Sequence, residues 1–300
     1  MKKVFLSVFF ALLGISLMAQ EPVTLKLHLE KGKVYKAKSS SKQNLQIAAG
    51  GQQFNIDVFS SSIVTYKVLK QENDIMDVEL KFDTIVSKSN SPMGNKETNS
   101  AKPNMADPME RIMNKISTST IVAKISTAGK FVDFVNYPKF KDHVLFVLDS
   151  IPAGKRDQAK MMADALLQES AIRTRIEPLF AYLPEKAVKT GDTWETTYSL
   201  SANNATLLSL NTFTLKGVAN NVAAVSGKSE IESLPSNDPA AQMTQDLKGT
   251  MTADGTIDLS TGIMLKSTGK GHIEGTMTMK ANNSEMKMKM DSESESIMIK

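Results

Sequence analysis

Strict alternation of apolar and polar side chains runs through most of this 300-residue chain. Leucine and valine residues from Val23 to Leu29 alternate with polar neighbours, and the stretch from Met76 to Phe82 repeats the pattern. Because successive side chains of a β-strand point to opposite faces, this period of two predicts strands with one buried and one wet face. The chain is therefore expected to be mainly antiparallel β.

The last strands of the pattern carry methionine. Met286, Met288 and Met290 alternate with charged residues, and Met277 and Met279 come shortly before them. The pair Asn282-Asn283 lies between the two segments and tolerates left-handed backbone, so a hairpin is expected there. The methionines of this hairpin are then expected to share one face of a sheet.

The middle of the chain changes to a helical period. Residues 138–151 begin with Pro138 and carry apolar residues at helical spacing, and residues 155–173 carry a second apolar stripe. Pro178 is expected to open a short third helix, and residues 108–116 form a further amphipathic segment. A helical insert over 136–187 thus separates an N-terminal β-arm, 21–135, from a C-terminal β-arm, 188–300.

Three short matches occur in the same order in both arms. Residues 32–35 resemble 191–194, residues 68–78 align without a gap to 215–225, and residues 126–131 parallel 252–257. We interpret these matches as an internal duplication. The expected fold is α+β, with two related curved β-arms that form a half-barrel or open barrel and with the helical insert packed across them.

Residues 88–107 interrupt the alternation in the N-terminal arm. The segment is rich in Ser, Asn, Lys and Gly and has few apolar side chains. Such a segment buries too little apolar surface to offset the entropy of ordering it. A mobile loop is therefore expected over 88–107.

Residues 1–20 have the parts of a secretory signal peptide. Lys2 and Lys3 precede an apolar run of residues 4–17, which is too short for a membrane-spanning helix, and Ala19-Gln20 offers a cleavage site. The mature chain has no second long apolar run. We therefore expect an exported protein that is soluble in the periplasm or the medium.

The absence of cysteine narrows the chemistry of an exported chain. With no cysteine, disulfides, thiol nucleophiles and the lipid attachment of a bacterial lipoprotein are excluded. Two of the 36 Lys and Arg residues lie in the signal segment, so the mature chain is nearly balanced against its 32 Asp and Glu. Its basic residues are scattered, which excludes nucleic acid as a partner.

No catalytic motif stands out. The three histidines, His28, His143 and His272, lie in separate segments, and the chain lacks nucleophile-elbow, zinc-protease, phosphate-loop and calcium-loop patterns. We therefore expect neither enzymatic activity nor a cofactor. The alternative is a hydrolase whose site is assembled only by folding and cannot be recognised from the sequence.

The methionines support two binding hypotheses. Flexible thioethers repack around varied apolar ligands, so Met277, Met279, Met286 and Met288 are candidates to line an apolar, lipid-like pocket. Alternatively, Met286, Met288 and Met290 resemble the thioether ladders of periplasmic copper-binding proteins, in which soft sulfur suits Cu(I). The sequence leaves both hypotheses open, together with binding of a partner protein of the cell envelope.

Two tripeptides resemble a glycosylation signal. Asp83-Thr84-Ile85 and Asp149-Ser150-Ile151 are similar to the Asp-Ser/Thr-apolar acceptor of general O-glycosylation in Bacteroidota. The resemblance implies that Thr84 and Ser150 carry sugars and are accessible at the surface.

The segment 183–194 is similar to one that recurs in secreted Bacteroidota proteins of a domain family of unknown function. Its motif is Val188-Lys189-Thr190-Gly191-Asp192-Thr193-Trp194. The resemblance implies an envelope protein and brings no catalytic residues with it. We therefore expect an exported, non-enzymatic envelope protein that binds an apolar ligand or a partner protein.

Overall fold

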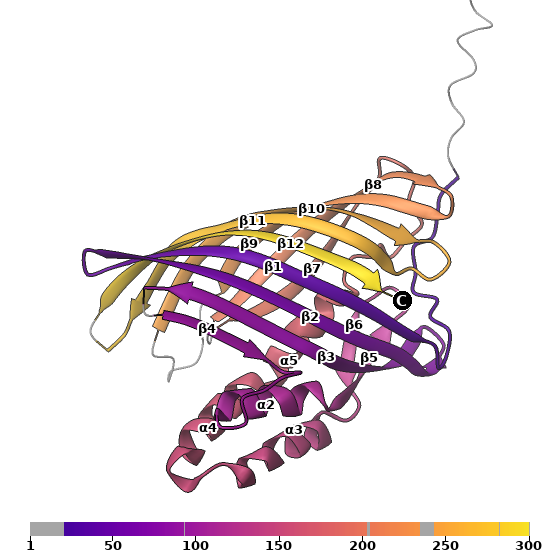
Figure 1. Cartoon of the computed structure of the whole chain (residues 1–300). Coiled ribbons are helices and arrows are strands. Elements are labelled where there is room, and N and C mark those ends of the chain that lie inside the picture. The colour runs from indigo at the N-terminus through magenta and orange to yellow at the C-terminus, as the bar shows by residue number, and fades with distance from the viewer. Residues whose placement is uncertain (1–20, 93, 203–204, 235–242, 282, 300) are drawn as a thin grey trace, which may run out of the picture.

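Twelve strands of the chain form one antiparallel sheet in a computed structural model, which describes residues 21–92, 94–202, 205–234, 243–281 and 283–299. The strand order is β6-β5-β3-β2-β1-β12-β11-β10-β9-β8-β7, and β4 pairs with β3. The sheet is open rather than closed, and it curves around the face that carries the helices (Figure 1). The predicted mainly antiparallel α+β fold is confirmed.

The first half of the chain supplies β1 (Val34–Ala49), β2 (Gln52–Glu72), β3 (Ile75–Ser91), β4 (Gly94–Asn99), β5 (Thr120–Ser126) and β6 (Phe131–Phe134). The second half supplies β7 (Thr193–Ala202), β8 (Ala205–Ala219), β9 (Val222–Leu234), β10 (Met243–Asp258), β11 (Met264–Met279) and β12 (Ser284–Ile299). The two halves meet in the middle of the sheet, where β1, the first strand along the chain, pairs with β12, the last strand along the chain.

The helices follow the predicted segments with one extra break. They are α2 (Pro108–Ser117), α3 (Tyr137–Leu145), η1 (Phe146–Ser150), α4 (Ala153–Leu166), α5 (Glu169–Ile176) and η2 (Glu177–Leu179). The segment expected as one helix over 155–173 is two helices, because Gln168 is extended, with φ −58° and ψ 139°. The α2 helix begins where the Asp107 carboxylate accepts hydrogen bonds from the Met109 and Glu110 amides.

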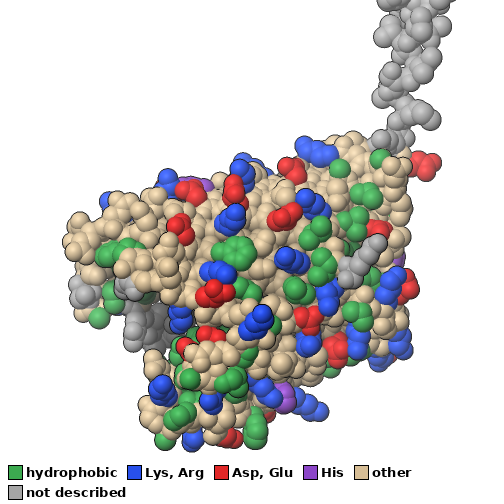
Figure 2. Space-filling view, viewed as in Figure 1, with side chains coloured by type: hydrophobic (Ala, Val, Ile, Leu, Met, Phe, Trp, Pro, Cys, Tyr) green, Lys and Arg blue, Asp and Glu red, His purple; other side chains and the backbone are tan. Residues whose placement is uncertain are grey.

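The sheet has two chemically different faces. On the face toward the helices, called the inner face here, Val64, Tyr66 and Leu80 are buried together with Ile112 of α2 and Ile172 of α5. On the outer face, lysines and carboxylates alternate with these positions along the same strands (Figure 2). Burial of the inner face against the helices supplies the hydrophobic contribution to stability at this end of the sheet.

The same structural details recur in the two arms. Tyr35 stacks on Tyr66 with ring centroids 5.7 Å apart, and Trp194 stacks on Phe213 at 5.8 Å. The Gly32 amide donates to the Val68 carbonyl, and the Gly191 amide donates to the Leu215 carbonyl.

The irregularities of the two arms also correspond. The β2–β3 ladder shifts register between Val68 and Lys70, and the β8–β9 ladder shifts between Leu215 and Gly217, at positions equivalent in the gapless alignment of 68–78 with 215–225. These shared features support the interpretation of the first two sequence matches as parts of related β-units. The third match does not correspond, because residues 126–131 include the β5–β6 turn whereas 252–257 lie inside β10.

The expectation of a loop over 88–107 is wrong for much of its length. Residues 88–91 extend β3, and β4 pairs with them, from Val86 opposite Asn99 to Ser91 opposite Gly94. Backbone hydrogen bonds make this pairing possible without an apolar face. The buried Ser100 anchors its end, since its hydroxyl accepts from the Ile85 amide and its amide donates to the Ile85 carbonyl.

The predicted signal segment, residues 1–20, lies outside the described residues. In the part of the chain that the structure describes, no helix combines the length and the apolar character needed to cross a membrane.

Candidate functional site

A band of serines crosses the inner face of the sheet beside the helix-covered core. The cross-strand registers place Ser41 opposite Ser60 and Ser294, and Ser39 opposite Ser62 and Ser296. Ser87 of β3 continues the first of these rows from Ser60. We call these seven residues the serine belt.

The serine belt forms one wall of a cavity of about 500 Å³. The η2 helix and the residues after it close the cavity on the helix side, with Leu179 and Tyr182 facing Tyr66 of β2. Met251, Met264 and Met298 complete the apolar part of the lining. Part of the space between the sheet and the helices is therefore hollow, beside the packed core.

The tyrosines of the cavity differ in their hydrogen bonds. The Tyr182 hydroxyl donates to the Gly262 carbonyl at 3.0 Å and accepts from the Met264 amide at 2.9 Å. Among the described residues, the only partner of the Tyr66 hydroxyl is the Met298 sulfur at 3.5 Å, a weak acceptor. Burial raises the pKa of both phenols well above the ordinary value, so both stay neutral at physiological pH.

One belt hydroxyl is unsatisfied. The Ser41 Oγ is buried and has no hydrogen-bond partner among the described residues. Ser39 and Ser296, by contrast, join their hydroxyls across β1 and β12 at 3.0 Å. A buried hydroxyl without a partner costs free energy, so the Ser41 Oγ marks a place where a polar group of a ligand or a water would be stabilised.

On the C-terminal arm, a buried amide organises the polar groups. Asn211 accepts hydrogen bonds from the Ser209 hydroxyl at 2.9 Å and the Ser229 hydroxyl at 2.6 Å. Its Nδ2 donates to the Thr196 carbonyl at 3.2 Å. This network is satisfied internally, which gives it a structural role at the edge of the cavity.

The methionines predicted to line a pocket lie farther along the same inner face. Met286 is directly opposite Met277, Met288 is opposite Ile47, and Met290 is opposite Leu45 and Ile273. The buried Leu247 and Ile273 pack against this group. We call Met277, Met286, Met288 and Met290, with Leu45, Ile47, Leu247 and Ile273, the methionine patch.

The sequence therefore predicted the face on which these methionines lie but not the position of the cavity. Met277, Met286 and Met288 share the inner face as expected, and Met279 follows at its rim, 37% exposed. None of the four lines the cavity beside the helices, whose methionines are Met251, Met264 and Met298. Sequence reasoning missed the serine belt, although the serine runs 39–41 and 60–62 and the alternating serines of β12 were visible as a signal.

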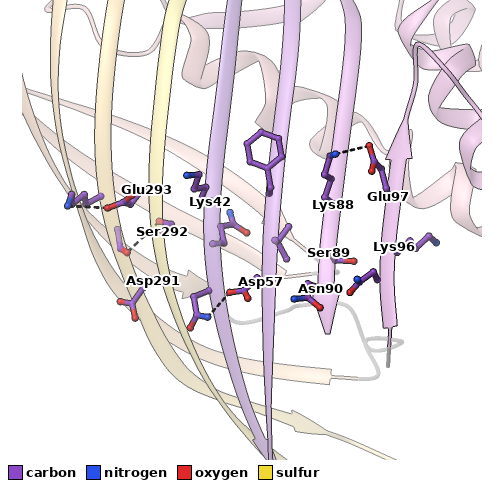
Figure 3. Close-up of a pocket in the computed structure, with 17 residues that line it drawn as sticks. Lys42, Asp57, Lys88, Ser89, Asn90, Lys96, Glu97, Asp291, Ser292 and Glu293 are labelled. Carbon is purple, nitrogen blue, oxygen red and sulfur yellow. Dashed lines mark hydrogen bonds and ion pairs between the residues drawn. The ribbon is translucent and has the colours of Figure 1, made fainter. Parts of the chain in front are cut away.

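A larger hollow, of about 1000 Å³, lies against β11, β12, β1, β2, β3 and β4 and includes outer-face side chains (Figure 3). Two of its lysines pair with carboxylates, Lys88 with Glu97 at 3.0 Å and Lys270 with Glu293 at 3.1 Å. Asn44 donates to the Asp57 carboxylate at 2.9 Å. Such mutually paired, exposed groups are typical of a solvated surface, so we place the candidate site on the inner face.

The histidines do not assemble a catalytic arrangement in the described residues. His272, on the outer face, lies 2.7 Å from the Asp291 carboxylate and 3.5 Å from that of Glu274, and no hydrogen bond joins a described histidine to a serine. The hydrogen bond with Asp291 raises the pKa of His272. Within the same residues, no three His, Cys, Asp or Glu side chains are grouped so that they could hold a metal ion.

The two predicted glycosylation residues have different surroundings. Ser150 is exposed at the end of η1, and its hydroxyl donates to the Val147 carbonyl at 2.7 Å. Thr84 is half-buried in β3, opposite Ile63. Of the two, Ser150 is the more accessible.

Comparisons with known proteins give a family but no activity. No curated protein matches the chain. Among solved structures, it is similar to an outer membrane channel from Pseudomonas putida F1, with 9% identity, coverage of 91% of this chain and 98% of that chain, and a TM-score of 0.28. It is also similar to OpdQ from Pseudomonas aeruginosa, with 7% identity, coverage of 89% and 100%, and a TM-score of 0.26.

A sequence family is identified more firmly. The model described as "Family of unknown function (DUF6263)" matches residues 73–264, which include the motif from Val188 to Trp194. The match spans more than half of the chain, from the β2–β3 turn to the start of β11. The chain therefore belongs to the DUF6263 family.

Proposed function

We propose that this protein is a non-catalytic protein of the cell envelope that binds a lipid-like apolar molecule on the inner face of its sheet. The observation that carries the proposal is the continuous and almost entirely uncharged lining of that face. From the cavity beside the helices, the lining continues through the serine belt to the methionine patch. In the described strands, the registers turn only one charged side chain inward, Lys96 on β4.

The outer face of the sheet, unlike the inner face, carries many charged side chains. Lys287, Lys289 and Glu293 occupy alternate positions on β12, whose inner positions are serine or methionine. Because ionised groups avoid apolar surroundings, this segregation favours an inner face that contacts apolar material. Thioether side chains adapt to varied shapes, which suits a ligand with a flexible chain.

Affinity for an apolar fluorescent probe tests the proposal. Met288→Lys adds a lysine to the inner face, whereas Thr250→Lys adds one to the exposed outer face of β10. We expect Met288→Lys to weaken probe binding at least tenfold, about 1.4 kcal/mol, and Thr250→Lys to change it less than twofold. Urea unfolding of both variants controls for loss of structure.

Two results would contradict the proposal. One is equal probe affinity for the two lysine variants when both remain folded. The other is the absence of both probe binding and any lipid in solvent extracts and native mass spectra of protein purified from its own host.

The envelope location is part of the proposal and rests on residues 1–20. Expression of the full chain should yield a mature protein that begins at Gln20 or Glu21, as measured by intact mass, in the periplasmic or extracellular fraction. A full-length protein that stays in the cytoplasmic fraction would refute this location.

A second candidate function is soft-metal binding. Met277 and Met286 are direct cross-strand partners, which brings two thioethers within reach of one Cu(I) ion, and Met288 follows on the same face. Titration with Cu(I) against a chromophoric chelator should then show affinity tighter than micromolar that Met286→Leu abolishes. Met161→Leu, at a 74% exposed position on α4, is the control.

A further inference from the structure

The serine belt is a costly choice of residues for a sheet face beside a hydrophobic core. Ser87, Ser60, Ser41 and Ser294 form one row across four neighbouring strands. Valine or isoleucine would pack better at such positions, since β-branched side chains suit a half-buried pleated surface. Folding alone therefore does not account for a whole row of hydroxyls.

Hydrogen-bonding capacity in the cavity remains unused by the protein. Within the described part of the chain, the Ser41 Oγ is buried without a hydrogen-bond partner, and the Tyr66 hydroxyl hydrogen-bonds only to the Met298 sulfur. Both groups line the same cavity. Tyr66 lies opposite Tyr35, six residues along β1 from Ser41, so a ligand that offers polar atoms at the serine belt would satisfy the Ser41 hydroxyl.

Charge near the belt is scarce. Glu295 borders the cavity but alternates with Ser294 and Ser296 on β12 and pairs with Lys266 at 3.2 Å. Glu177, buried in η2, pairs with Arg173 at 2.6 Å. The one inward lysine of the described strands, Lys96, is exposed on β4. The lining of the cavity contains no Lys or Arg among the described residues, so an ionised carboxylate at Ser41 would lose its hydration without gaining a counter-charge from that lining.

The geometry also orients the ligand. On the helix side, the cavity ends at Leu179, Tyr182 and Tyr66, which belong to the packed core. On the other side, the inner positions of β1 become apolar at Leu45 and continue to Ala49. From Ser41 to Ala49 the strand extends about 27 Å, long enough for a long acyl chain.

We propose that the ligand is an amphiphile with an uncharged, hydrogen-bonding polar group, which binds at the serine belt, and that its acyl chain runs away from the helices along the methionine patch. A monoacylglycerol has this chemistry. The inference rests on the proposed function and adds the polar group of the ligand and its direction in the site.

Displacement of the apolar probe from delipidated full-length protein tests the inference. We expect monooleoylglycerol to displace the probe at concentrations at least tenfold lower than oleate at pH 8, where the carboxylate is ionised. The double variant Ser41→Val, Ser60→Val should lower the affinity for monooleoylglycerol, relative to the affinity for the apolar probe, at least fivefold. Thr250→Val, on the outer face, is the matched control and should change neither affinity.

The outcomes separate this inference from the proposed function. The inference would be overturned if oleate bound as tightly as monooleoylglycerol, or if the double valine variant kept the full preference for monooleoylglycerol over oleate. In either case the proposed binding of apolar molecules would still stand. Failure of the probe and of both amphiphiles to bind would remove the proposed function itself. Because the valine changes take away an unsatisfied hydroxyl, the double variant is expected to fold, and urea unfolding checks this.

Discussion

Removal of one hydroxyl, that of Tyr182, should weaken the connection between the helices and the sheet. This hydroxyl is the point at which the segment after η2 is joined to the β10–β11 turn, through the Gly262 carbonyl at 3.0 Å and the Met264 amide at 2.9 Å. Tyr182→Phe keeps the ring, so it creates no large cavity, but it leaves a buried acceptor and a buried donor without their partner. Each such group costs about 1–3 kcal/mol, which sums to about 2–6 kcal/mol.

Tyr66→Phe is the matched control for this prediction. Tyr66 is also a buried tyrosine whose pKa is raised by burial, but its hydroxyl hydrogen-bonds, among the described residues, only to the Met298 sulfur at 3.5 Å. Its loss should cost less than about 1 kcal/mol. Urea unfolding followed by tryptophan fluorescence measures both variants, since Trp194 donates its indole N–H to the Tyr182 carbonyl at 3.0 Å.

The comparison has a clear refuting result. If Tyr182→Phe and Tyr66→Phe lower the free energy of unfolding by amounts within about 0.5 kcal/mol of each other, hydrogen-bond satisfaction is not what holds this end of the cavity closed. An unchanged dependence on urea concentration in both variants shows that the same surface is exposed on unfolding.

Three further predictions concern the fold and the outer face. Gly262→Ala should prevent folding, as judged by soluble yield, because Gly262 has φ +72° and a Cβ there would lie 2.0 Å from the Lys26 carbonyl oxygen. Gly154→Ala is the control, since its Cβ meets no atom within 4 Å, and it should leave the free energy of unfolding unchanged or raise it by up to about 1 kcal/mol. Asp107→Ala should lower the free energy of unfolding in urea by about 1 kcal/mol through loss of the α2 cap, and an unchanged midpoint would contradict this. The pKa of His272, followed by NMR, should lie above its ordinary value and fall in Asp291→Asn. The contribution of this raised pKa to stability is fully present at pH values below the ordinary pKa and is lost as the pH rises through the raised pKa. Equal pKa values of His272 in the two proteins would refute the pairing.

Much of the fold could be predicted because its signals are local. The period of two identified strands such as β3 and the faces that they bury, and the helical spacing with Pro138 and Pro178 located the insert. The alternation over 23–29 forms no strand, since only an isolated bridge joins Val23 to Val188, although the leucines of that segment are buried. The methionines of the β11–β12 hairpin share one face because alternation allows no other arrangement within a regular strand. The loop expected over 88–107 was wrong in part because strand pairing depends on a neighbouring strand, which composition does not reveal.

The amino-acid sequence by itself determined the type of most elements and which side chains share a face within a regular strand, since both follow from the geometry of the local backbone. Tertiary structure decided the site. The row of Ser41 and Ser294 joins strands from opposite ends of the chain, and Ser87 joins this row because the register shift between Ile63 and Val64 changes which residues of β3 face inward. Long-range register and a single irregularity in pairing thus turned scattered serines into one belt beside an apolar patch, because alternation specifies a face within a strand but not the neighbours of that face.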